Sequence, residues 1–347
     1  MFPYLLLLGF VLFWIFLEKK SLNRKAFWVP SFALIVFATI RNSTVGTDTG
    51  LYVKNFVNKL DPDYYEFHEG MESGYLLLEY IILNISHNYF WLFFITSIIV
   101  VFLQMVVIKK YSINYILSIF IFITLGGYTF FLNGLRQGIA MAIFFVSLPF
   151  LINKNFLKYF LICIFASFFH ISALFMIPFY FIVNLKWKIE WKIIFIFLSS
   201  LLLSKSMINL LADSNEKYAG YTEVSDSSGG FLILLFYFVV FLLIYLIKNK
   251  INIKDNKEFN ALFQFYSCGL FFILGISFLQ TNPSGPQRLL SYFILALIFI
   301  IPIVLKNLNN KLINLFVIIF LIVYFMLRLD RFANYVPYII NPYFEIF

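Results

Sequence analysis

The sequence predicts an all-α integral membrane protein, a polytopic bundle of about 10–12 transmembrane helices with an extracytoplasmic vestibule. Two observations support this fold class. Of the 347 residues, 62% are hydrophobic and only 12% are charged, and the mean hydropathy is +0.90, whereas a soluble domain carries about 25% charged residues. The apolar residues also form runs of about 20, the length that crosses about 30 Å of hydrocarbon. We therefore expect a single membrane domain over residues 1–347.

Twelve apolar runs account for most of the chain. The third is longer than a span requires, and we interpret it as an interfacial helix (72–86) joined to a true span (88–108). The sixth and seventh are short and meet at the polar sequence His170-Ile171-Ser172, as the arms of a bent hairpin would. The predicted helices cover residues 2–17, 26–40, 75–108, 112–132, 134–152, 156–169, 171–185, 191–211, 230–247, 259–279, 287–305 and 312–327.

The distribution of charge predicts the topology. No Lys or Arg precedes the first apolar run, and a basic cluster follows it, which is opposite to the order in a cleavable signal peptide. Because basic residues accumulate in cytoplasmic loops, we expect a retained first helix with its N-terminus outside. The inner loops, with Lys158 at a helix edge, then hold 17 of the 26 Lys and Arg residues. These loops are 18–25, 109–111, 153–155, 186–192, 248–258 and 306–311; the extracytoplasmic segments include the loops 41–74 and 212–229 and the tail 328–347.

Composition and missing motifs exclude several classes of function. The net charge of +9 reflects the basic inner loops, so nucleic acid is not expected as a partner. Cys163 and Cys268 lie inside apolar runs, which argues against a disulfide framework or a metal cluster. The sequence has no Walker motif, Gly-rich nucleotide loop or H-E-x-x-H, and the inner loops are too short to bind a nucleotide sugar. We predict no cofactor and no metal, and a substrate that arrives from the membrane or from outside.

Four cationic or cationisable residues lie near the predicted outer surface: Arg41, Arg136, His170 and Arg288. The last three stand where helices running inward begin, a position at which a cation is unfavourable by itself. An Arg beside helix amides is favourable when an anion binds there, phosphate above all. A simpler reading is that each Arg extends to the lipid head groups, and that Gly134 and Gly138 form a packing seam. The sequence leaves both readings open.

Two outward residues are candidates for a general base. Asp48 lies in Val45-Gly46-Thr47-Asp48-Thr49, where its carboxylate either forms an Asx turn or acts as a base near Arg41. His170 stands at an apolar break, where the imidazole either hydrogen bonds to a helix end or acts as acid, base or phosphate ligand. Glu72 and Glu79 are weaker candidates.

Four segments carry a resemblance to a known family. They are residues 41–52 (RNSTVGTDTGLY), 72–75 (ESGY), 135–140 (LRQGIA) and 169–174 (FHISAL). In order and spacing they resemble the EpsG family of Wzy-like polysaccharide polymerases, over about half of the chain. Arg288 matches no motif of that family, and its candidacy comes from its place at a helix start.

The resemblance implies a glycosyltransferase that joins oligosaccharide repeat units linked through pyrophosphate to undecaprenol, for an O-antigen, capsule or exopolysaccharide. It implies the bacterial cytoplasmic membrane, with the active site facing the periplasm or the cell exterior. The partners implied are membrane lipids, a flippase and a chain-length regulator. We predict that Arg136 and Arg288, assisted by Arg41 and Gln137, bind the pyrophosphate, and that Asp48 or His170 deprotonates the acceptor hydroxyl. Tyr52, Tyr64 and Tyr65 are candidates for stacking on sugars.

Three other functions remain as alternatives. A flippase or transporter of lipid-linked oligosaccharide needs charged groups at the bilayer midplane, whereas nearly all charges here lie at span ends. A membrane O-acyltransferase usually takes its acyl donor from the cytoplasm, so its key residues should face inward. A glycan ligase shares the substrate and the topology and differs only in its acceptor.

Overall fold

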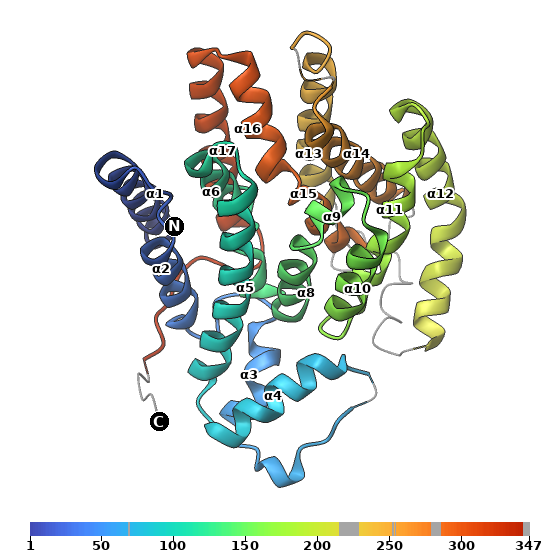
Figure 1. The fold of residues 1–347 in the computed structure, drawn as a ribbon. Coiled ribbons are helices and arrows are strands. Elements are labelled where there is room, and N and C mark those ends of the chain that lie inside the picture. The colour runs from blue at the N-terminus through green and yellow to red at the C-terminus, as the bar shows by residue number, and fades with distance from the viewer. Residues whose placement is uncertain (69, 215–228, 252, 254, 279–285, 343–347) are drawn as a thin grey trace. The chain divides into compact units, whose positions relative to one another are not determined.

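A computed structural model describes residues 1–68, 70–214, 229–251, 253, 255–278 and 286–342 (Figure 1). These residues form seventeen α-helices and no β-strand, with one isolated bridge between Arg41 and Ile340. The chain divides into two compact units. Unit 1 comprises Met1–Ser147, Leu161–Ala173 and Asn310–Phe347, and unit 2 comprises Leu148–Phe160 and Leu174–Asn309.

Most helices lie within the predicted apolar runs, but α3 (Thr49–Val57) falls in the predicted loop 41–74, and the runs 112–132, 134–152 and 287–305 are each broken into separate helices. In chain order they are α1 (Phe2–Leu22), α2 (Trp28–Thr39), α3 (Thr49–Val57), α4 (Ser73–Ile85), α5 (Tyr89–Tyr111), α6 (Tyr115–Thr124), α7 (Phe130–Asn133), α8 (Leu135–Phe145), α9 (Leu148–Ile152), α10 (Phe156–Ser167), α11 (Ile177–Asn184), α12 (Ile189–Ser214), α13 (Gly229–Ile247), α14 (Lys257–Ser277), α15 (Leu290–Ile294), α16 (Leu297–Leu308) and α17 (Lys311–Arg331). Short 3₁₀ helices cover η1 (Pro62–Tyr64), η2 (Ile171–Met176) and η4 (Pro286–Leu289).

Several of these helices are long and apolar enough to cross a membrane. By length and composition they are α1, α5, α13, α14 and α17, and the bent pair 287–294 and 297–308, with a 47° bend, makes a sixth if it counts as one span. The prediction of an all-helical, polytopic membrane protein is confirmed. Most of the other predicted spans coincide with shorter apolar helices, and 191–211 lies within the 26-residue α12, so the number of about 10–12 spans stays a prediction. The predicted loop 212–229 falls largely outside the described residues.

The overlong third run is two helices, as predicted. α4 ends at Ile85, and α5 begins at Tyr89 after the extended residues Ser86 and Asn88. The Asn88 Oδ1 accepts a hydrogen bond from the Phe90 backbone N–H at 2.9 Å, which satisfies one of the unpaired amides at the start of α5. This polar stop separates a 13-residue helix from a 23-residue span.

The predicted span 112–132 is interrupted between α6 and α7. Gly126 there has φ +83°, a conformation that L side chains rarely adopt. The Arg328 Nη1 of α17 donates to the Leu125 carbonyl at 2.9 Å. A cation thus satisfies a carbonyl at the C-terminal end of α6, where the helix dipole favours positive charge.

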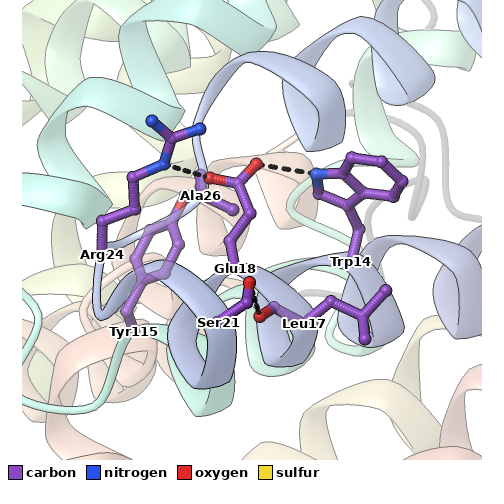
Figure 2. Close-up of polar contacts among 7 residues, drawn as sticks. All are labelled: Trp14, Leu17, Glu18, Ser21, Arg24, Ala26 and Tyr115. Atoms are coloured by element: carbon purple, nitrogen blue, oxygen red, sulfur yellow. Dashed lines mark hydrogen bonds and ion pairs between the residues drawn. The ribbon is translucent and has the colours of Figure 1, made fainter.

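Unit 1 has one end that gathers basic loops, here called the basic end. The Lys25 ammonium donates to the Lys109 carbonyl at 2.7 Å, and the Tyr115 hydroxyl donates to the Ala26 carbonyl at 2.6 Å. The Glu18 carboxylate accepts from Trp14 Nε1 and from Arg24 Nε, each at 2.7 Å (Figure 2). The predicted inner loops 18–25 and 109–111 therefore meet, which agrees with the grouping that the charge pattern indicates.

At the other end of unit 1, here called the motif end, the C-terminal segment lies beside residues 40–47. The Asn42 N–H donates to the Ile339 carbonyl and the Asn341 N–H to the Ile40 carbonyl, both at 2.8 Å. The Gly46 N–H donates to the Asn334 carbonyl at 3.2 Å. The loop 41–74 and the tail 328–347, which were predicted to share one side of the membrane, are thus joined directly.

Unit 2 is packed around α14. Phe293 lies 4.6 Å from Phe179 and 4.9 Å from Phe265, between ring centroids. Gly269 of α14 gives this ring its space, because a Cβ there would lie 2.0 Å from the Phe293 ring. Lys192 is buried and donates from Nζ to the Val183 carbonyl at 2.8 Å.

Candidate functional site

An ion pair between Arg136 and Glu72 lies at the motif end. The Arg136 Nη1 and the Glu72 Oε2 are 2.6 Å apart, and the two side chains are only 10% and 9% exposed. Arg136 is the second residue of α8, and Glu72 is the N-cap of α4. A cation at a helix N-terminus is unfavourable and an anion is favourable, so the carboxylate offsets the charge that the start of α8 disfavours.

Glu72 also ties in a third segment. Its Oε1 accepts a hydrogen bond from the Ile171 N–H at 3.3 Å. Two residues on, the Gly74 N–H donates to the Phe168 carbonyl at 2.8 Å, and a Cβ on Gly74 would lie 2.7 Å from that oxygen. Residues 72–74 therefore fit against residues 168–171 so closely that a side chain at position 74 is excluded.

His170 lies in this contact region, half-buried. Its Nδ1 is 2.7 Å from the Ser172 Oγ and 3.2 Å from the Ser172 backbone N. The adjacent residue, Ile171, is the one that donates to Glu72. The structure thus brings Arg136 into direct contact with the Glu72 carboxylate, and the group from the His170 turn that reaches this carboxylate is the Ile171 N–H.

Two tyrosines enclose the Arg136 guanidinium. Its Cζ lies 5.9 Å from the centre of the Tyr52 ring and 5.8 Å from that of Tyr75. The two rings are 5.8 Å apart at an interplanar angle of 66°. Such ring faces attract a cation. Tyr52 comes from α3 and Tyr75 from α4, so the site is built from segments that lie far apart in the sequence.

The Asp48 loop is fixed to the residues that precede Arg136. The Asn133 Oδ1 accepts from the Asp48 N–H at 2.8 Å and from the Thr47 hydroxyl at 2.9 Å. Gly46 has φ +102°, which allows the tight turn before these residues. Asp48 is the N-cap residue of α3, but its side chain does not cap that helix. Its carboxylate is partly exposed at the motif end, and its role as a base stays a prediction.

A second buried carboxylate, Glu79, faces inward from α4. Its Oε1 accepts from Asn55 Nδ2 at 3.0 Å and its Oε2 from the Tyr65 hydroxyl at 2.9 Å. Burial, and then the nearby Glu79 carboxylate, raise the pKa of Tyr65, which keeps the hydroxyl protonated as a donor. Tyr65 thus holds the loop to α4, whereas Tyr64, predicted with it to stack on sugars, is exposed.

Arg41 lies in a different environment from the Arg136–Glu72 pair. Its side chain is fully buried, with Nη1 on the Ala38 carbonyl and the guanidinium carbon 3.8 Å from the centre of the Phe93 ring. Its Nε and Nη2 have no hydrogen-bond partner among the described residues. The carbonyl end of α2 and the ring face both favour a cation. Arg41 is therefore packed between α2 and α5, and its part in pyrophosphate binding stays a prediction.

The remaining predicted residues are placed as follows. Gln137 is buried on α8 beside Arg136. Arg288 is half-buried in η4 of unit 2, and its role also stays a prediction. Sequence reasoning ranked Glu72 low because nothing local links it to Arg136, although the segment 72–75 was among those that carried the resemblance.

Within the described part of the chain no group of three His, Cys, Asp or Glu residues could hold a metal ion.

The comparison with known families settles the relationship. The model of the EpsG family matches residues 24–340, nearly the whole chain and all four segments of the resemblance. The chain belongs to the EpsG family. This membership makes it a membrane protein related to polysaccharide biosynthesis. No curated protein and no solved structure matches it.

Proposed function

We propose that this EpsG-family protein is a polysaccharide polymerase that joins undecaprenyl-pyrophosphate-linked repeat units at the outer face of the bacterial cytoplasmic membrane. The observation that supports this most is the convergence of four separate segments on one ion pair. Tyr52, Glu72, Tyr75, Arg136 and the turn at His170 meet at the motif end, within one compact unit.

The orientation of the site follows from charge. The basic end of unit 1 carries Lys19, Lys20, Lys109 and Lys110 in the last turns of α1 and α5. The positive-inside tendency favours the cytoplasm for that end. α5 has 23 residues, which span about 34 Å at 1.5 Å per residue, enough to cross the hydrocarbon. The motif end would then face the periplasm or the cell exterior, where exported lipid-linked units arrive.

The reaction needs a group that accepts negative charge from the leaving group. The acceptor hydroxyl oxygen attacks the anomeric carbon of the growing chain, the bond from that carbon to the phosphate oxygen breaks, and its electron pair leaves with undecaprenyl pyrophosphate. Arg136 would stabilise the developing charge, because a preorganised cation in a water-poor site acts strongly on a departing anion. A bound diphosphate would compete with Glu72 for the Arg136 guanidinium.

The proton of the acceptor hydroxyl needs a base at the same end. Asp48 and His170 remain the candidates: Asp48 through its loop on Asn133, and His170 through its position next to the Glu72 contact. Gln137, next to Arg136 on α8, would assist in binding the pyrophosphate, and the parts of Arg41 and Arg288 in that binding stay predictions. No nucleotide is consumed in this step, because the glycosyl–pyrophosphate bond already stores the energy. A flippase would supply the substrate and a chain-length regulator would act on the product.

The test is replacement of Arg136 in cells that make the surface glycan. Arg136→Ala, at normal protein level, should abolish the polymer ladder on gels and leave the one-unit product. Arg331→Ala provides a matched control, because Arg331 is an exposed Arg in the last turn of α17. A ladder of wild-type length in Arg136→Ala would refute the proposal. In a deletion strain, loss of all exported units would indicate a flippase, and polymer accumulating on the lipid carrier would indicate a ligase.

A further inference from the structure

α4 is an apolar helix that is too short to cross a membrane. Its 13 residues extend about 20 Å, against about 30 Å of hydrocarbon. It runs across the direction of α5, to which only residues 86–88 connect it (Figure 1). α5 is long and apolar enough to span a membrane, and this link joins α4 to its first residue, Tyr89. α4 therefore lies across one end of a candidate span.

The two faces of α4 differ in an unusual way. Leu77, Ile81 and Ile85 are 52%, 48% and 67% exposed, and their spacing of four residues places them on one stripe. Glu79, the only charged residue of the helix, points the other way and is buried against Asn55 and Tyr65. A helix that faces water carries its charges on the exposed side. Here the exposed side carries these three apolar residues together with the uncharged Ser73 and Asn84, and the charge is buried.

Apolar and aromatic residues adjoin α4 at both ends. At its N-terminal end, Gly74 contacts Phe168, which is exposed together with Phe165 one turn earlier. At its C-terminal end the chain passes into Tyr89, Phe90 and Trp91, a run of aromatic residues of the kind that is enriched at membrane surfaces. Phe165 and Phe168 at the N-terminal end are exposed, the aromatic run 89–91 at the C-terminal end is half-buried, and all of these residues belong to unit 1.

We propose that α4 lies in the plane of the membrane and that its stripe of Leu77, Ile81 and Ile85 inserts into the lipid surface at the motif end. Burial of these side chains among acyl chains removes apolar area from water and is therefore favourable. The electrostatic cost is small, because this face of the helix carries no charge. The occupant of the surface is membrane lipid.

One consequence rests on the proposed function. Glu72 is the N-cap of α4 and Tyr75 lies in its first turn, and both contact Arg136. An α4 fixed in the lipid surface would hold the Arg136 site at the depth of the lipid head groups. A diphosphate attached to a lipid lies at that depth, so the substrate would reach Arg136 without leaving the membrane.

Spin labels on the full-length protein in liposomes test the placement. The native Cys163 and Cys268 are replaced by Ala, and a single Cys is introduced at Leu77, Ile81 or Ile85. A matched control label stands at Lys54, an exposed position on α3. Oxygen, which concentrates in lipid, and a water-soluble nickel chelate report the surroundings of each label. We expect the oxygen-to-nickel accessibility ratio at the three stripe positions to exceed the ratio at position 54 and to indicate burial in acyl chains.

Two results would overturn the proposal. Labels at the stripe that meet the nickel chelate as often as the label at position 54 would place α4 in water. Labels that neither reagent reaches would mean that protein covers the stripe. The measurement involves no glycan, so it can fail while Arg136→Ala still abolishes polymer, and the reverse can also occur. The two proposals are therefore tested separately.

Discussion

Exchange of the two charges in the Glu72–Arg136 pair separates its contribution to the fold from its contribution to the reaction. Each side chain is about nine-tenths buried, and the Arg136 Nη1 and the Glu72 Oε2 are 2.6 Å apart. Removal of one partner from such a pair leaves an uncompensated buried charge and costs about 3–5 kcal/mol. Glu72→Arg and Arg136→Glu should each destabilise the protein by about this amount or more, because each places like charges together.

The double variant Glu72→Arg/Arg136→Glu restores opposite charges at the same two positions. We expect it to recover most of the lost stability, measured as thermal unfolding of the purified protein, while the polymer ladder stays absent because the cation no longer stands at the start of α8. Glu66→Arg, on an exposed residue of the same loop, is the control and should change neither readout. A double variant that makes polymer of normal length would show that the pair only joins α4 to α8. One that remains as unstable as the single variants would show that the pair does not hold these helices.

Two further substitutions test the local structure. Gly126→Ala should lower the unfolding temperature, because φ is +83° there, which costs an L residue about 1–2 kcal/mol, and because the new Cβ would lie 2.2 Å from the Arg328 Cζ. The control Gly9→Ala, with open space around it, should have little effect. Equal stability of the two variants would contradict the structure. Tyr65→Phe should cost about 1–3 kcal/mol in denaturation, because it removes a hydrogen-bond donor from the buried Glu79 carboxylate; an unchanged unfolding curve would mean that water satisfies this group.

Local patterns in the sequence account well for the helices. Apolar run lengths place α1, α5, α13, α14 and α17 close to their observed positions, because a helix buried in lipid satisfies its own backbone and needs only enough apolar residues. The polar residues Ser86 and Asn88 likewise predict the break between α4 and α5. The interruption of 112–132 at Gly126 is harder to see, since a glycine within an apolar run is also compatible with an unbroken helix.

The sequence by itself determined a membrane-embedded helical chain, the loops that gather basic charge, and the four segments that resemble one family, because hydropathy, charge and motifs are local properties. Only the tertiary structure decided which of these residues meet. Arg136 and Glu72 are 64 positions apart, and their pairing depends on how α4 and α8 pack. The same packing buries Arg41 against Phe93, away from that pair, although both arginines look alike in the sequence. Contacts over such separations follow from the arrangement of whole helices, which no local pattern specifies.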